Sequence, residues 1–141
     1  MKLLFLFTLI VLSNLFSCNK DVKVMKRIKG NWEIVKYSQT DANSFTKPIF
    51  AKGYFKFNSI ANNKAIGEYE YKYLFGDSLN KSVNSNGSYL SNYKDEALYL
   101  QPNINQSMKK KFHIDFLTTS DAILEYNDLE FIHRFVLKKT N

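Results

Sequence analysis

The chain has 141 residues, which is enough for one domain and too short for two of ordinary size. The formal net charge is +7, but only two of the 20 basic residues are Arg, and the lysines are scattered apart from short runs at 109–111 and 138–139. Nucleic-acid-binding proteins cluster their charge and rely on Arg, so this composition does not favour a nucleic-acid partner. Cys18 is the single cysteine, which excludes an intramolecular disulfide and leaves stability to apolar burial.

The first residues have the pattern of an export signal. Lys2 supplies a positive charge and precedes a mostly apolar run over residues 3–16, which is too short to cross the ~30 Å hydrocarbon core of a bilayer comfortably. The run ends in Leu15-Phe16-Ser17-Cys18. This tetrapeptide resembles the lipobox of bacterial lipoproteins, in which the cysteine sulfur accepts lipid. The resemblance implies a signal peptide over residues 1–17 and a lipid-anchored chain that starts at Cys18.

Lipid on Cys18 would hold the protein at a membrane, because each buried methylene of an acyl chain such as palmitate contributes about 0.8 kcal/mol. The next residue is Asn19 rather than the Asp that retains some lipoproteins in the inner membrane. The outer membrane is therefore favoured. The sequence leaves open whether the protein lies on its periplasmic face or at the cell surface. An ordinary secretory signal with an incidental cysteine is the alternative.

Residues 18–30 are expected to form a tether or a short helix. Val22, Met25 and Ile28 recur at helical spacing, and Gly30 is placed to end a helix. We expect this segment to pack beneath the domain that follows. From Asn31 onward the apolar period changes to two, and turn residues separate eight strand-like runs. These runs cover residues 31–39, 52–58, 64–75, 82–91, 96–101, 110–117, 121–127 and 129–138.

Alternation gives each run one apolar face, and most connections are short enough for a meander. Residues 31–141 are therefore predicted to form one all-β domain, a small antiparallel eight-stranded barrel, because closure removes exposed edges. A two-sheet sandwich is the alternative. An eight-stranded barrel is just wide enough for one small ligand. The inward-facing sets are Phe55 and Phe57; Tyr69, Tyr71, Tyr73 and Phe75; Phe112, Ile114 and Phe116; and Leu129, Phe131, His133, Phe135 and Leu137.

Two segments at the ends of this domain resemble lipocalin-like proteins. Gly30-Asn31-Trp32 is similar to the Gly-x-Trp motif that opens their first strand, and residues 135–139 are similar to the closing strand of small lipocalin-like lipoproteins. The resemblance implies a lipocalin-like barrel with Trp32 at its floor. It also implies that Arg134 covers Trp32 in a cation–π contact. A solvent-facing Arg134 is the alternative.

No pattern in the sequence indicates catalysis, a metal site or a cofactor. His113 and His133 lie in separate alternating runs without further ligands at metal-binding spacing. Glu68 and Glu70 share a face with Lys72, which is typical of a solvated outer surface rather than an acid–base pair. The sequence contains no phosphate-binding loop or nucleophile elbow. We therefore expect a protein that is not an enzyme.

The tyrosine stripe is the strongest candidate for a binding site. Tyr69, Tyr71 and Tyr73, together with Phe55 and Phe57, offer aromatic walls and hydroxyl groups for an amphipathic molecule. Packing of these side chains in the core is the alternative interpretation. The long connection over residues 40–51 contains Phe45, Ile49 and Phe50. We expect it to form a lid over the barrel mouth or a plug within it.

Two functions are compatible with these features. The first is a membrane-anchored module that binds a small apolar or amphipathic ligand in the bacterial envelope, and it predicts a continuous apolar cavity under residues 40–51. The second is a packed β-domain that contacts a protein, as an inhibitor or accessory subunit of an envelope complex. That function predicts an exposed aromatic patch. The candidates for the patch are Tyr37, Tyr54, Tyr89, Tyr93 and Tyr99.

Overall fold

The computed structural model describes residues 20–60, 65–104 and 109–140. The signal peptide predicted for residues 1–17 and the lipidation site predicted at Cys18 lie outside this part of the chain. The elements in chain order are α2 (Lys20–Ile28), β1 (Gly30–Thr40), β2 (Thr46–Ile49), β3 (Ala51–Ser59), β4 (Ile66–Phe75), β5 (Lys81–Asn92), β6 (Ala97–Pro102), β7 (Lys110–Leu117), β8 (Asp121–Asn127) and β9 (Ile132–Thr140).

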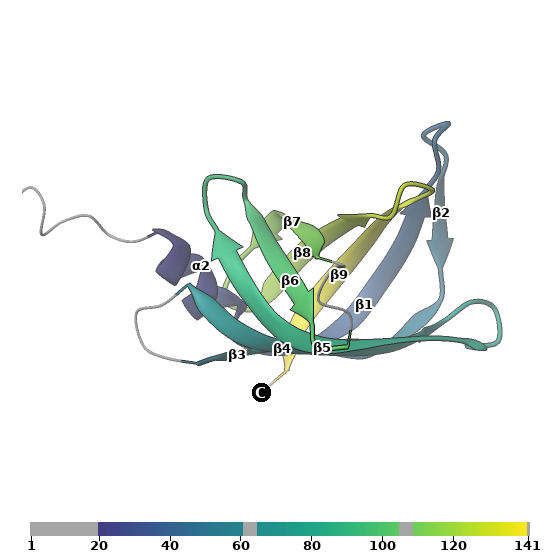
Figure 1. Ribbon diagram of the computed structural model, residues 1–141. Coiled ribbons are helices and arrows are strands. Elements are labelled where there is room, and N and C mark those ends of the chain that lie inside the picture. Colours follow the sequence, from purple (N-terminus) through teal and green to yellow (C-terminus); the bar gives the residue numbers. More distant parts are fainter. Residues whose placement is uncertain (1–19, 61–64, 105–108, 141) are drawn as a thin grey trace, which may run out of the picture.

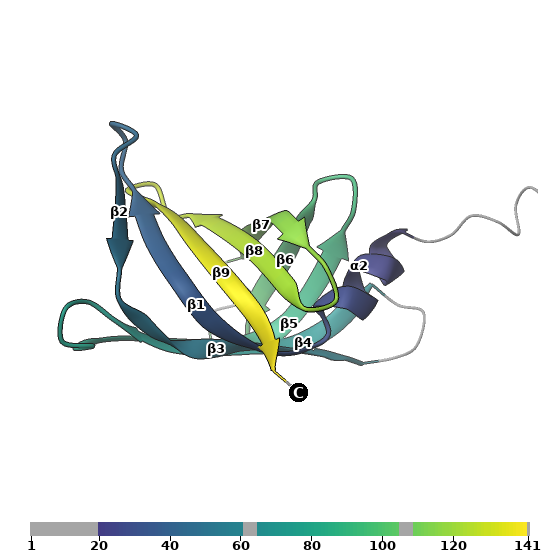
Figure 2. The ribbon, with the colours of Figure 1, turned by 180° about the vertical axis from the view of Figure 1, so that it is seen from behind.

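Eight of the strands close into an antiparallel barrel. The order is β1-β3-β4-β5-β6-β7-β8-β9, and β9 pairs with β1 to complete the circle (Figures 1 and 2). β1 pairs with β3 through residues 30–33 and with β2 through residues 37–40. β2 and β3 therefore follow one another along the same edge of β1, interrupted at Phe50. The predicted eight-stranded all-β barrel is confirmed, with β2 as an additional strand.

The connection over residues 40–51 is the first difference from the prediction. It was expected to be a lid or a plug, but its second half is β2, which extends the wall of the barrel beside β1. The side chain of Asp41 holds the hairpin turn, because its Oδ1 accepts hydrogen bonds from the backbone N–H groups of Asn43 and Phe45, each at 2.9 Å. Such Asx geometry is a local turn signal that favours a hairpin over a lid.

The last strand begins at Ile132 rather than at residue 129. Leu129 lies in the turn before it with φ at +83° and is 98% exposed, so its predicted inward position is wrong. Asn127 Oδ1 accepts a hydrogen bond from the Leu129 backbone N–H at 2.9 Å, and Asp128 Oδ1 accepts one from that of Phe131 at 2.9 Å. These side chains compete with the strand ladder for the backbone N–H groups and stabilise a turn instead.

A β-bulge in β7 corrects a second predicted face. The register with β8 shifts between Ile114 and Phe116, so the extra residue Asp115 moves the following side chains to the opposite face of the sheet. Phe116 is consequently 49% exposed, although alternation predicted it inside. Leu117 packs against the core in its place.

α2 closes one end of the barrel, which we call the floor end (Figures 1 and 2). Met25 and Ile28 on one face of α2 are buried in the core, and Gly30, with φ at +131°, follows the last helical turn as the sequence predicted. The opposite end carries the turns β1–β2, β4–β5 and β8–β9, and we call it the open end. Among the described residues, no helix is long and apolar enough to cross a membrane.

Candidate functional site

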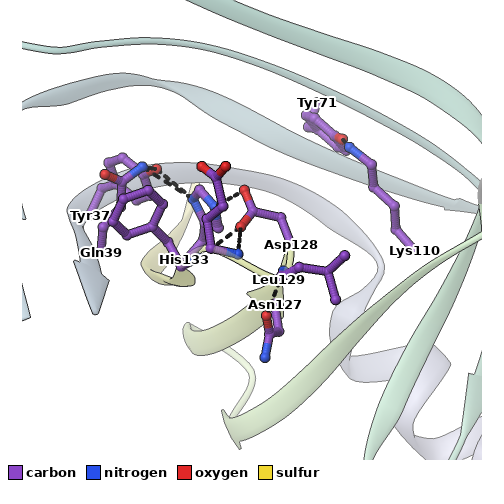
Figure 3. A network of polar contacts seen from close by, with 10 residues as sticks. Tyr37, Gln39, Tyr71, Lys110, Asn127, Asp128, Leu129 and His133 are labelled. Atoms are coloured by element: carbon purple, nitrogen blue, oxygen red, sulfur yellow. Dashed lines mark hydrogen bonds and ion pairs between the residues drawn. The ribbon is translucent and has the colours of Figure 1, made fainter. Parts of the chain in front are cut away.

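His133 is the centre of a polar network at the open end of the barrel. It follows the alternation of Phe135 and therefore points inward from β9. His133 Nδ1 lies 2.7 Å from the hydroxyl oxygen of Tyr37 on β1, and its Nε2 lies 2.7 Å from Asp128 Oδ2 in the β8–β9 turn (Figure 3). Gln39 Nε2 donates a hydrogen bond to the Tyr37 hydroxyl oxygen at 2.8 Å. Both ring nitrogens of this buried histidine are thus satisfied.

One assignment of protons satisfies all the contacts of this network. Because Tyr37 accepts a hydrogen bond from Gln39, its own hydroxyl proton is available to His133 Nδ1, and His133 Nε2–H then donates to Asp128. Burial raises the pKa of Tyr37 to about 12. Burial also acts to raise the pKa of Asp128, but hydrogen bonds from the Phe131 backbone N–H and from His133 outweigh it and hold that pKa below its usual value. Asp128 is therefore an anion and Tyr37 a neutral phenol at neutral pH.

The aromatic rings around Tyr37 indicate a structural role for this network. Its ring stacks on Phe135 with centroids 4.9 Å apart and lies 5.9 Å from the ring of Tyr73. The hydroxyl is enclosed by these rings and by His133, so the network ties β1, β9 and the β8–β9 turn together. No group of three or more His, Cys, Asp or Glu side chains suited to a metal ion occurs among the described residues.

The second polar feature at the open end is Lys110, the first residue of β7. Its ammonium donates a hydrogen bond to the Tyr71 hydroxyl oxygen at 3.2 Å (Figure 3). It also lies 5.2 Å from the centre of the Tyr126 ring and 5.9 Å from that of Tyr71. These distances are typical of cation–π contacts. A positive charge is thus held among aromatic rings at the mouth of the barrel.

An open pocket of about 490 Å³ lies beside Tyr71 and Lys110. β6 pairs with β5 only along residues 87–92. Residues 84–86 of β5 therefore have β4 on one side and line the pocket on the other. The remaining lining side chains come from β4, β5 and the end of β6, and they are Glu70, Lys72, Asn84, Ser85, Asn86, Pro102 and Ile104.

The five side chains predicted to bind a ligand are all buried in the core, and of them only Tyr71, which is 2% exposed, also borders this pocket. Tyr71 lines the pocket, and the Tyr69 hydroxyl lies 2.9 Å from Oγ of Ser85, which also lines it. Phe55 and Phe57 are each 1% exposed, and Tyr73 is also buried. The Phe55 ring lies 5.1 Å from that of Tyr71 and 6.4 Å from that of Tyr73. Aromatic rings therefore fill the interior where a continuous apolar cavity was predicted, and the open space lies at the mouth.

The floor end corrects the predicted partner of Trp32. Trp32 is fully buried there, and its indole N–H donates to the Ile28 carbonyl oxygen at 2.6 Å. Arg134 does not cover it, because residue 134 alternates outward; its guanidinium binds Glu125 and, at 2.6 Å, Asp115. Lys139 has the inward parity of Phe135 and takes that place, with its ammonium 4.8 Å from the Trp32 ring centre.

Sequence reasoning missed Lys110, Gln39 and Asp128 because each lies near the end of a strand, where alternation no longer indicates its neighbours. It also placed Tyr37 and Tyr89 among candidates for an exposed patch, but both are buried. Alternation could not have placed Tyr37 inside, because it has the opposite parity to Trp32 and Ile34 and the register of β1 shifts between Ile34 and Lys36. Tyr89 has the parity of Val83 on the same strand, which packs against the core. Of the remaining candidates, Tyr54 and Tyr93 are exposed and Tyr99 is partly buried.

No protein-family model and no curated protein matches the chain. Among solved structures, it is similar to a de novo designed fluorescence-activating β-barrel, with a TM-score of 0.56 and 10% identity over 83% of this chain and 97% of the other. A redesigned β-barrel bound to DFHBI gives a TM-score of 0.53 and 12% identity over 82% and 98%. A further redesigned β-barrel gives 0.54 and 10% over 84% and 96%. At this identity the likeness is one of fold, a closed antiparallel barrel.

Proposed function

We propose that the protein is a membrane-anchored lipoprotein whose lipocalin-like barrel binds a small amphipathic ligand in the bacterial envelope, acting by binding rather than catalysis. The observation that carries the proposal is the pocket of about 490 Å³ beside Tyr71 and Lys110. Its volume is in the range of small-molecule sites, about 300–1,000 Å³. The packed interior behind it makes the mouth, rather than the centre of the barrel, the place for a ligand.

The lining of the pocket supports a particular chemical class of ligand. Pro102 and Ile104 offer apolar surface beside the largely buried Tyr71, and Ser85 offers a hydroxyl group. Lys110 supplies an ammonium that already contacts two aromatic rings. A molecule with a flat apolar body and an acidic end matches this arrangement. The complex of one designed barrel with DFHBI supports the proposal, because it is an instance of a small molecule held by this fold.

The anchoring part of the proposal rests on the lipobox-like segment that ends at Cys18. α2 begins at Lys20 and lies at the floor end, so lipid on Cys18 would place the floor end toward the membrane and the pocket away from it. We favour the outer membrane. Cys18→Ser is expected to abolish labelling of the protein with palmitate and to abolish its recovery as a lipid-modified mature chain, as measured by mass spectrometry of the membrane fraction.

The ligand site is tested with 8-anilinonaphthalene-1-sulfonate, an aromatic anion whose fluorescence rises on binding. Lys110→Met is expected to weaken its binding about tenfold or more, because charge-assisted hydrogen bonds contribute about 1.5–3 kcal/mol. Lys111→Met is the matched control, since Lys111 is exposed and its ammonium lies over the Tyr99 ring instead. Equal affinity of the two variants for the probe would show that the pocket does not hold the anion.

A second function, contact with another envelope protein as an inhibitor or accessory subunit, is favoured by exposed apolar side chains at the open end. Phe45 in the β1–β2 turn is 68% exposed, Phe50 is 57% exposed, and Leu129 in the β8–β9 turn is almost fully exposed. If this function holds, native mass spectrometry of protein from its own host shows a stoichiometric protein partner, and the triple variant F45S/F50S/L129S loses it. A co-purifying small molecule instead supports the pocket.

A further inference from the structure

The outer face of α2 is basic, and its residues do not line the ligand pocket. Met25 and Ile28 bind α2 to the barrel, whereas Lys20, Lys23 and Lys26 are exposed to solvent. Arg27 and Lys29 are exposed as well. In the sequence these basic residues are interspersed with other residues, and only Lys26 and Arg27 are adjacent. The helix brings them to one side, because its apolar face is buried.

The positive charge of the protein is concentrated on this segment. The ten residues 20–29 include five Lys or Arg and one acidic residue, so they hold four of the seven net positive charges of the whole chain. Asp21, the acidic residue, is directed to the barrel: its carboxylate accepts a hydrogen bond from the Tyr93 backbone N–H, and its carbonyl accepts one from the Ser91 hydroxyl at 2.8 Å. No ion pair in the described part of the chain involves Lys23, Lys26 or Arg27.

A shallow groove of about 360 Å³ runs between α2 and β7 beside the basic face. Lys23 and Arg27 line it on one side, and Phe116, which the bulge in β7 turns outward, lines it on the other. Glu96 and Asp115 also line this groove, and Asp115 is paired with Arg134. The surface thus combines unpaired cations with an exposed aromatic ring, a combination suited to the headgroup region of a bilayer.

We propose that the outer face of α2 binds the surface of a bilayer that contains anionic phospholipid, with Lys23, Lys26 and Arg27 as the principal contacts. This interaction goes beyond the proposed ligand site, lies at the other end of the barrel, and does not require lipid on Cys18. Each Lys or Arg held near an anionic membrane strengthens binding about fivefold. The attraction is electrostatic, since the apolar face of α2 is already occupied by the core.

The experiment uses the chain from Asn19 to the end, without lipid. The whole core lies between Met25 and Leu137, so this chain contains the complete folded unit. Its binding to vesicles of phosphatidylcholine with phosphatidylglycerol is measured by co-sedimentation and compared with vesicles of phosphatidylcholine alone. Binding is expected only to the anionic vesicles at about 10 mM salt, where the Debye length is about 30 Å, and is expected to be lost near 1 M, where that length is about 3 Å.

Two matched variants locate the contact. K23Q/K26Q/R27Q removes three charges from α2 and is expected to weaken binding to the anionic vesicles about a hundredfold at low salt. K47Q/K52Q/K81Q removes three charges from the open end. Its affinity for the anionic vesicles is expected to stay close to that of the unmodified chain. Glutamine has nearly the helix propensity of lysine, and circular dichroism checks that both variants fold. Equal losses in the two variants, or no binding of the unmodified chain at low salt, would overturn the proposal.

Discussion

His133 shows at the residue scale how a polar side chain is accommodated inside an aromatic barrel. Its ring stacks with that of Tyr37 at a centroid distance of 6.0 Å and lies 5.7 Å from that of Tyr126. An unpartnered polar group in such surroundings costs about 1–3 kcal/mol. The contacts of His133 with Tyr37 and Asp128 avoid this cost, and they make the stability of the open end depend on the charge of a single carboxylate.

The free energy of unfolding is therefore expected to depend on Asp128 at acid pH. Hydrogen bonds lower its pKa in the folded state, so its contribution is present above the ordinary aspartate pKa of 3.8 and is lost as the pH falls through and below that value. Asp128→Asn should flatten the decline in unfolding free energy between about pH 5 and pH 2. Asp77→Asn, in the exposed β4–β5 turn, is the control and should leave the decline unchanged. Urea titrations at several pH values measure both.

Tyr89 is a buried tyrosine whose hydroxyl has no hydrogen-bond partner among the described residues. Tyr89→Phe is expected to raise the free energy of unfolding by up to about 1–3 kcal/mol, the usual cost of an unsatisfied buried polar group. Tyr69→Phe is the comparison, because the Tyr69 hydroxyl is paired with Ser85. Removing this hydroxyl should leave the free energy of unfolding unchanged or lower it. Destabilisation by Tyr89→Phe in urea unfolding would contradict the prediction.

At the element scale, α2 is a part of the core. Nine residues are too few for a helix that is stable alone in water. α2 is held by the side chains of Met25 and Ile28 and by contacts to its backbone: the Trp32 indole donates to the Ile28 carbonyl, and the Lys139 ammonium donates to the Arg27 carbonyl at 2.9 Å. The helix and the floor of the barrel therefore form together.

Ile28→Ala is expected to lower the free energy of unfolding by about 2–5 kcal/mol, because it leaves a cavity between α2 and Trp32. Lys26→Ala on the exposed face of the same helix should change it by no more than about 0.5 kcal/mol. Chemical denaturation followed by tryptophan fluorescence measures both, since Trp32 is the single tryptophan. Equal effects of the two substitutions would show that α2 does not contribute to the core.

Strand prediction succeeded where alternation was regular and failed where one residue changed the register. Tyr69, Tyr71 and Tyr73 alternate without interruption, and all three lie inside as predicted. Phe116 follows the same sequence pattern, but the bulge at Asp115 turns it outward. Such an insertion depends on pairing with β8, and a single strand carries no signal for it.

At the scale of the whole molecule, closure through β1 and β9 makes one continuous aromatic interior. Burial raises the pKa of Tyr37 to about 12 and raises the pKa of Tyr73 and Tyr89 as well. These phenols must stay protonated in the folded state, whereas they ionise near pH 10 when the chain is unfolded. Their contribution to stability is therefore complete below pH 10 and is lost as the pH rises above it.

The protein is thus expected to unfold in one cooperative transition as the pH rises above about 10. The part of the tyrosinate absorbance at 295 nm that comes from the buried tyrosines should rise together with the loss of β-sheet circular dichroism, because these tyrosines ionise only when the barrel opens. Tyr37→Phe should reduce the slope of the unfolding free energy against pH in this range. Tyrosinate absorbance from all tyrosines well before any loss of β-sheet signal would contradict the prediction.

The sequence by itself determined the class of fold, because alternation with a period of two is a local property of each strand and short turns leave few ways to connect eight of them. It also identified many of the aromatic side chains that occupy the interior, but not Tyr37 and Tyr89. Only the tertiary structure decided that those rings fill the space, that Lys139 rather than Arg134 covers Trp32, and that His133 joins Tyr37 to Asp128. Each of these contacts joins residues far apart in the chain or at strand ends, where they depend on closure and register.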